Sequence, residues 1–483
     1  MVTETPLQIA LLGFALAAPA VWVWRNPVSA TIVVLAYLAF EELILLAVPQ
    51  TFYAGSRLAP DLLLSVAAVS SVVAAWRSYV GGRPRILWPE VALAFTLVLG
   101  VAVAFARRVE LPFIIVGVRW LFRYIPVYIV WRLRASDNDR RALLRVTTII
   151  VFVQAIIGVS QALLQSAGVP VLDWMQARVG SADIGGIDIV TGGTKQRLGL
   201  PFYVFGTLGR YHRYGIFLAA AGLIPAFLLI YRVRRDEVIR AGLGVTAIAL
   251  LLSTSRQALL LAVLAIVGAG WFRLGLSERT SRIIRGLSIV GVVAGSLLLA
   301  FGFLAVLRGA SSFVARLVNF RTLGFRAYYL AVIVPKALHA SHFGGFGIGT
   351  FGSRPHVAAH ADMYLQLGFP GVWALQYSYD SEWAILLGQL GVVGFLLFYS
   401  AIGGFGWYAW RALVRGSTVN DLEAKVILAS AVCLTSVLPL MGGIGAELGS
   451  RTTAYVVWAV IGAAMSYAAP VFDRSGTSAQ VIS

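Results

Sequence analysis

The stretch of this sequence that decides its fold begins RGASSFVARLVNFRTLGFR, residues 308–326, and continues to Asp380 as sequence that is rich in histidine and poor in acidic residues. It interrupts an otherwise apolar chain. Four of the five histidines lie within it, against only two acidic residues, Asp362 and Asp380. The interruption predicts a basic loop that membrane helices on either side hold against a membrane surface.

The composition predicts a polytopic membrane protein. Of the 483 residues, 59% are hydrophobic and 12% are charged, whereas soluble proteins carry about 25% charged residues. Apolar runs of about 20 residues recur along the chain, as in transmembrane helices. The net charge of +18 comes mostly from arginines in short loops, where positive charge sets topology, so nucleic acid is not an expected partner. The single cysteine, Cys433, excludes an intrachain disulfide and a cysteine metal cluster.

The apolar runs predict an all-α bundle of thirteen spans, with twelve to fourteen as the range. They form one transmembrane domain over residues 1–470, with 308–380 inserted as a large extracytoplasmic loop and 471–483 as a disordered cytoplasmic tail. The predicted spans are approximately 7–24, 28–48, 61–79, 88–107, 111–132, 142–166, 211–231, 241–253, 257–272, 287–307, 382–410, 422–441 and 452–469.

The basic loops predict the orientation. With thirteen alternating spans, the arginine clusters near residues 83, 132, 232, 273 and 411 all fall on one side, which the positive-inside rule assigns to the cytoplasm. The opposite side then holds residues 167–210, Ser253–Arg256, 308–380 and 442–451, together with all five histidines. Arginines on that side gain nothing from topology, so we expect another role for them.

Arg256 is the first candidate for that role. It follows Ser253-Thr254-Ser255 at the end of the eighth predicted span. An arginine at this depth is costly unless it snorkels to the surface or meets an anion. Its planar fork suits a phosphate. A snorkelling helix-end arginine is the structural alternative.

Two further clusters lie on the same predicted side. Arg210 and His212 precede the seventh span within a stretch that begins at Gly206-Thr207. Arg321 and Arg326 lie on a stretch with helical apolar spacing, 311–338, which predicts an amphipathic helix in the interface, broken near Pro335. The alternative is that this basic helix only anchors the loop to lipid headgroups.

Acidic residues supply the other candidates. Asp380 and Glu382 begin the eleventh span, where an acid either caps the helix or acts as a general base. Glu41 and Glu42 lie inside the second span, and we expect them to pair with Arg119 and Arg123 of the fifth. The glycine-rich turn 344–352 follows no predicted strand, which excludes a dinucleotide-binding loop. The histidines around it lack the spacing of a zinc site, so no metal or other cofactor is expected.

The order of these motifs resembles the O-antigen ligase and polymerase superfamily. The resemblance covers residues 200–395: Gly206-Thr207 before a span, Thr254-Ser255-Arg256 at a span end, an arginine-bearing loop helix, the Gly347–Phe351 turn, and a glycine-spaced span after Gly388. The earlier segments match only as generic spans.

The resemblance implies a metal-independent, inverting glycosyltransferase of the cytoplasmic membrane, with its active site on the outer side. Its donor is a glycan on undecaprenyl diphosphate, and its partners are a glycan acceptor, membrane lipids and other envelope polysaccharide assembly proteins. Arg256 and Arg326 match the family's diphosphate ligands; Arg210 matches more loosely, and Arg321 is their neighbour. Where ligases carry His-Asn, this chain has Asp380-Ser381, which favours a polymerase of repeat units over a ligase. A polysaccharide or lipid transporter is the alternative from another class.

Three residues are candidates for the base that activates the acceptor. Asp380 is the first, and His212 and His360 are the others. The arginines would stabilise the charge that develops on the departing diphosphate.

Replacing Arg256 by alanine should abolish product formation while leaving membrane insertion intact, because the leaving diphosphate would lose a bidentate partner. The measurement compares lipid-linked glycan products from membranes that contain equal amounts of each protein. Wild-type turnover by the variant would exclude this role.

Overall fold

The computed structural model describes about two thirds of the chain, and all of the regular secondary structure in it is helical. The described residues are 17–77, 86–169, 204–208, 211–231, 233, 237–253, 255, 258–259, 261–263, 330, 333–351, 360–367, 381–415, 421–442 and 451–477. The helices are α2 (Pro27–Ala39), α3 (Glu41–Ala47), α4 (Gln50–Arg77), α5 (Trp88–Ala106), α6 (Leu111–Phe122), α7 (Ile125–Arg134), α8 (Asp137–Ser166), α11 (Tyr211–Ala221), α12 (Leu223–Ile230), α13 (Glu237–Leu252), α18 (Val334–Ala340), α20 (Ala361–Gln366), α21 (Glu382–Arg415), α22 (Leu422–Gly442) and α23 (Arg451–Thr477).

The chain is an all-α, multi-pass membrane protein, as its composition predicts. Six described helices are long and apolar enough to cross a membrane, and the bent pair α6–α7 makes a seventh. The predicted tenth span, most of the ninth, and most of the loop 308–380 lie outside the described residues. The full count of thirteen therefore stays a prediction.

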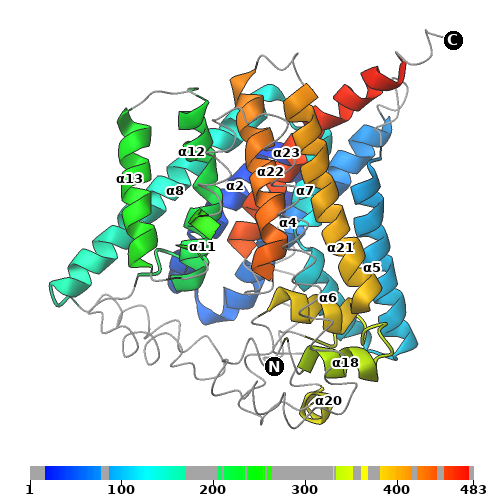
Figure 1. Cartoon of the computed structure of the whole chain (residues 1–483). Helices are drawn as coiled ribbons and strands as arrows, with labels where there is room; N and C mark the ends of the chain where they lie inside the picture. The colour runs from blue at the N-terminus through cyan, green and yellow to red at the C-terminus, as the bar shows by residue number, and fades with distance from the viewer. Residues whose placement is uncertain are drawn as a thin grey trace.

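The bundle is organised around α23. This helix packs against α7, α22 and α21, while α21 also packs against α5, and α8 packs against α13. Trp458 of α23 is fully buried and stacks on Tyr124 with ring centroids 4.4 Å apart. Figure 1 shows α18 and α20 beside each other at one end of the bundle, at the opposite end from the close of α7 and the start of α13.

Several helices are broken inside the bundle. The chain bends by 50° between α6 and α7, where Pro126 lies in the first turn of α7. A short break at Phe40 separates α2 from α3, and one at Gly222 separates α11 from α12. A fourth break divides α21 at Gly391, whose backbone has φ 65° and ψ −169°. The predicted eleventh span, 382–410, lies within one apolar stretch of membrane-spanning length, Glu382–Val414, and the kink at Gly391 divides this stretch into the half-helix Glu382–Leu390 and a longer part.

The break in α21 exposes backbone groups that the glycine-rich turn satisfies. The amide of Phe346 donates to the carbonyl of Gly388 at 2.8 Å, and the amide of Gly347 donates to Gln389 at 2.9 Å. In return, the amide of Val392 donates to the carbonyl of Phe343 at 3.1 Å. Backbone groups at membrane depth need such internal partners because lipid offers none. We call residues 343–351 the glycine loop, and the end of the bundle where they lie the glycine-loop end.

The glycines in this contact are required by geometry. A Cβ on Gly391 would lie 2.2 Å from the carbonyl oxygen of Phe343, and one on Gly345 would lie 2.5 Å from the amide nitrogen of Gly391. Both residues also have positive φ, which other residues adopt only with strain. The glycine-rich turn that the sequence displays is thus a docking surface for a broken helix.

Replacing Gly391 by alanine should lower the stability of the folded bundle by about 1–3 kcal/mol, because it combines a left-handed backbone with a clash against Phe343. The midpoint of thermal unfolding in detergent measures this. Gly403→Ala in the same helix is the matched control, since a Cβ there meets no atom within 4 Å. Equal midpoints for the two variants would contradict the docking role.

Candidate functional site

The structure describes little of the site that the sequence predicts. Five of its residues lie outside the described part of the chain: Arg210, Arg256, Arg321, Arg326 and Asp380. His212 lies in the first turn of α11, with its side chain outside the description. Only His360 is placed in full. The convergence of the arginines with Asp380 therefore stays a prediction, and the site is built here around His360.

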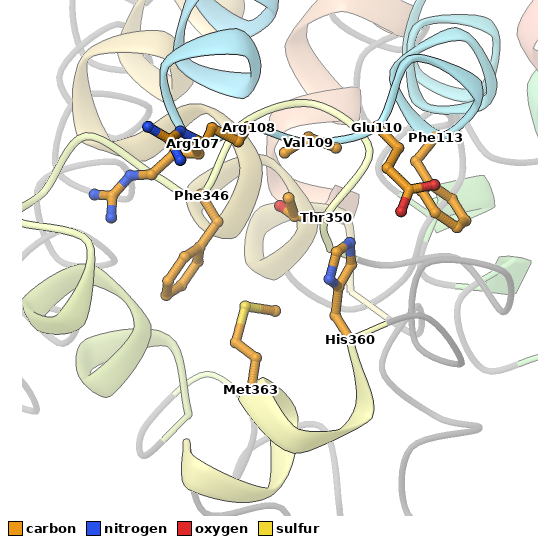
Figure 2. A pocket seen from close by; sticks show the side chains of 9 residues that line it. All are labelled: Arg107, Arg108, Val109, Glu110, Phe113, Phe346, Thr350, His360 and Met363. Atoms are coloured by element: carbon orange, nitrogen blue, oxygen red, sulfur yellow. The ribbon is translucent and has the colours of Figure 1, made fainter.

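His360 lines an open pocket of about 490 Å³ at the glycine-loop end. Three segments form its wall: the turn between α5 and α6, the glycine loop, and the start of α20 (Figure 2). The lining residues are Arg107, Arg108, Val109, Glu110, Phe113, Phe346, Thr350, His360 and Met363. Its volume is in the range of small-molecule sites, about 300–1,000 Å³.

The turn between α5 and α6 directs charged side chains to the pocket. The amide of Val109 donates to the carbonyl of Ala104 at 3.0 Å, a bond that reaches back five residues and closes the C-terminus of α5. Val109 itself is buried against Ala104 and Ile114. Because this valine anchors the turn, its neighbours Arg108 and Glu110 are left exposed.

Arg107 joins α5 to the glycine loop. Its Nη2 donates to the carbonyl oxygen of Ser341 at 3.1 Å, and its guanidinium carbon lies 6.0 Å from the ring centre of Phe346. Sequence reasoning missed Arg107 and Arg108. The available signal was that both lie at the predicted extracytoplasmic end of the fourth span.

The imidazole of His360 lines the pocket. Burial lowers the pKa of His360, although the carboxylate of Glu110 acts to raise it. Its ring lies 5.8 Å from that of Phe113, and Nε2 is buried without a hydrogen-bond partner among the described residues. A neutral imidazole with an uncommitted ring nitrogen can accept a proton, as a general base must.

The charges in the pocket are divided. In Figure 2 the guanidinium groups of Arg107 and Arg108 lie toward one side, and Glu110, Phe113 and His360 toward the other, with Thr350 between them. One side can therefore hold an anion, while the other can hold a hydroxyl group and receive its proton. Within the described ranges, no three side chains of the metal-binding types come close enough to hold a metal ion.

The Gly206-Thr207 motif before α11 is buried and held by two glutamines of α8. The amide of Gly206 donates to Gln161 Oε1 at 2.9 Å, and that of Thr207 donates to Gln154 Oε1 at 3.1 Å. Gln154 and Gln161 are two helical turns apart, on one face of α8. This pairing fixes where the chain enters α11, which begins at Tyr211, next to His212.

Ser381 caps the half-helix at the start of α21. The amide of Ala384 donates to its Oγ at 3.4 Å, and the Oγ donates to the carbonyl of Gly442 at 3.3 Å. Glu382 occupies the first turn and is buried. The predicted acidic start of this helix is thus present, but a serine provides the side-chain cap.

The intramembrane acids are ion-paired, as expected, but the predicted partners were wrong. Glu41 pairs with Arg451 at 2.5 Å, and Glu42 pairs with Arg57 at 2.7 Å. Arg119 instead pairs with Asp61 at 2.6 Å, and Asp61 also contacts Arg451 at 3.1 Å. The network connects α3, α4, α6 and α23. We interpret it as structural, because each of these charges is matched within the bundle.

Comparison with models of protein families and with curated proteins gives no match to this chain. The fold and the composition thus establish a polytopic, all-helical membrane protein. These comparisons do not assign an activity to the chain, so we propose one below.

Replacing Arg451 by methionine should destabilise the bundle by about 3–5 kcal/mol, because it leaves Glu41 buried without its partner. Loss of monodisperse protein and a lower unfolding midpoint in detergent measure this. Adding Glu41→Gln should restore part of the loss. The control is Arg240→Met, which removes an exposed pair with Glu237 and should change little. An unchanged midpoint for Arg451→Met would exclude a structural role.

Proposed function

We propose that this protein is a membrane glycosyltransferase that polymerises glycan repeat units carried on a polyprenyl diphosphate. The observation that supports it is the pocket at the glycine-loop end, where His360 faces two arginines across a cavity of about 490 Å³. A lipid-linked donor and a glycan acceptor would meet there, at the outer face of the cytoplasmic membrane. Two of the segments that carry the resemblance, the Gly347–Phe351 turn and the span that follows Gly388, contact each other at this end of the bundle.

The proposed reaction is a single displacement. The acceptor hydroxyl gives its proton to the imidazole of His360, and its oxygen forms a bond to the anomeric carbon of the donor sugar. The bond from that carbon to the diphosphate oxygen breaks, and the diphosphate leaves with the electron pair. Attack opposite to the leaving group inverts the anomeric carbon. The sequence ranks Asp380 first, with His212 and His360 after it, so Asp380 and His212 are the alternative bases.

Arginines are suited to the leaving group. Charge develops on the diphosphate as its bond to the sugar breaks, and preorganised guanidinium groups stabilise that charge without a proton transfer. We assign this role to Arg256, Arg326 and Arg210, with Arg321 as a neighbour. The reaction then needs only side chains of this chain.

A transporter is the second candidate, because a specific observation favours it. Helices α2–α3, α6–α7 and α11–α12 are broken inside the bundle, and a buried ion-pair network lies beside the first two breaks. Transporters use discontinuous helices and buried charges in this way. The charges here are matched, however, whereas the pocket at the glycine-loop end leaves a base available.

The test is reconstitution of the full chain in lipid vesicles with a synthetic polyprenyl diphosphate that bears one repeat unit. A ladder of products, each one repeat longer, would establish a polymerase. Transfer of a single preassembled glycan to a lipid or protein acceptor would establish a ligase. Movement of the glycan lipid between leaflets without new glycosidic bonds would establish a transporter and overturn the proposal.

Replacing His360 by glutamine should lower the rate of ladder formation about 10²–10⁴-fold, because an amide cannot accept the proton. His339→Gln is the matched control, since His339 is exposed on α18 and does not line the pocket. Equal rates for the two variants would exclude His360 as the base.

The dependence of kcat/KM on pH is a second test of His360 as the base. Since burial lowers the pKa of His360, the acidic limb of kcat/KM should lie below pH 6.5, the ordinary value for histidine. Glu110 raises that pKa, so Glu110→Gln should move the limb to still lower pH. A limb that shifts upward in Glu110→Gln would contradict the assignment.

A further inference from the structure

The two arginines of the pocket are not equivalent. Arg107 is engaged, since it donates to Ser341 and lies over Phe346. Arg108 is exposed, and its side chain has no hydrogen-bond or ion-pair partner among the described residues. Its planar guanidinium can therefore make a bidentate contact with an incoming oxyanion.

The backbone at Arg108 is strained. Its φ is 57°, in the left-handed region, at the position that ends α5. Glycine is the preferred residue at such a helix end, and a residue with a side chain is disfavoured there by about 1–2 kcal/mol. The turn itself would therefore be more stable with glycine. The arginine is best explained by its side chain, which supplies the pocket with a cation.

We propose that Arg108, together with Arg107, binds the carboxylate of an acidic sugar in the acceptor glycan. This inference rests on the proposed function and names its substrate class: glycans that contain uronic acid or another carboxylated sugar. The apolar walls of Phe113 and Phe346 suit the C–H faces of a sugar ring. The carboxylate at the arginines would orient that ring so that a hydroxyl faces His360.

The charge on the opposite side favours a carboxylate over the donor's diphosphate. The same cavity holds Glu110 as well as the two arginines. With neutral His360, the pocket carries one net positive charge among its lining residues, which a single carboxylate neutralises. A diphosphate would bring excess negative charge against Glu110. The donor's phosphates are nevertheless the second source of an oxyanion, and the experiment separates the two.

The test is a binding titration on the full chain in detergent, without turnover. The probes are a trisaccharide that contains one galacturonic acid residue (the acidic trimer), the neutral trisaccharide in which galactose replaces that residue, and inorganic pyrophosphate. We expect the acidic trimer to bind about 10- to 100-fold more tightly than the neutral one, because hydrogen bonds to a charged group are stronger than neutral ones. Binding should weaken with added salt.

Arg108→Gly separates binding from folding. It relieves the strained backbone, so its unfolding midpoint should equal or exceed that of the wild type, while its preference for the acidic trimer disappears. Arg240→Ala, which removes one exposed charge that does not line the pocket, should retain the preference.

Three results would overturn the proposal: equal binding of both trimers, an unchanged preference in Arg108→Gly, or a loss in that variant confined to pyrophosphate. The last would assign the arginines to the donor. None of these results bears on ladder formation. If the acidic trimer binds as expected but vesicles form no ladder, the subsite stands and the polymerase does not.

Discussion

The rest of the structure depends on one constraint: broken helices in a membrane bundle must find internal partners for their backbone groups. At the break in α21, the carbonyls of Gly388 and Gln389 accept the amides of Phe346 and Gly347. This contact ties the polar loop to a transmembrane helix. The two segments can make this contact only because each has a glycine where they meet, so that their backbones touch without side chains between them. The loop is thereby held as a rigid edge of the bundle.

The same constraint explains the other polar groups inside the bundle. Gln154 and Gln161 satisfy the backbone of Gly206-Thr207, which would otherwise be buried without partners. Of the acids near the α2–α3 break, Glu41 is matched by Arg451 of the distant helix α23, and Glu42 by Arg57 of the next helix, α4. In a low-dielectric interior, a charge left without its partner is strongly destabilising. These groups keep the irregular segments in place, whereas the pocket contains groups that are not committed to the fold.

The pocket follows from this arrangement. The docked glycine loop supplies Phe346 and Thr350, Val109 anchors the turn that presents Arg108 and Glu110, and the start of α20 brings His360 across from them. Arg108 has a strained backbone, and Nε2 of His360 has no hydrogen-bond partner within the described part of the chain, so neither feature contributes visibly to the stability of the fold. That is why both are assigned to a substrate, and why the proposed acceptor is an acidic glycan.

The sequence by itself determined the membrane class and the approximate positions of the described spans, because the partition of a segment into a bilayer depends on the hydropathy and charge of that segment alone. It also indicated that Glu41 would be paired, since an isolated charge cannot persist inside a bundle. Only the tertiary structure decided the partner, Arg451, which is 410 residues away. The tertiary structure likewise decided the break at Gly391 and brought Arg108 and His360 to the same pocket. Such pairings depend on how helices pack, and no local pattern specifies which distant segments will share a surface.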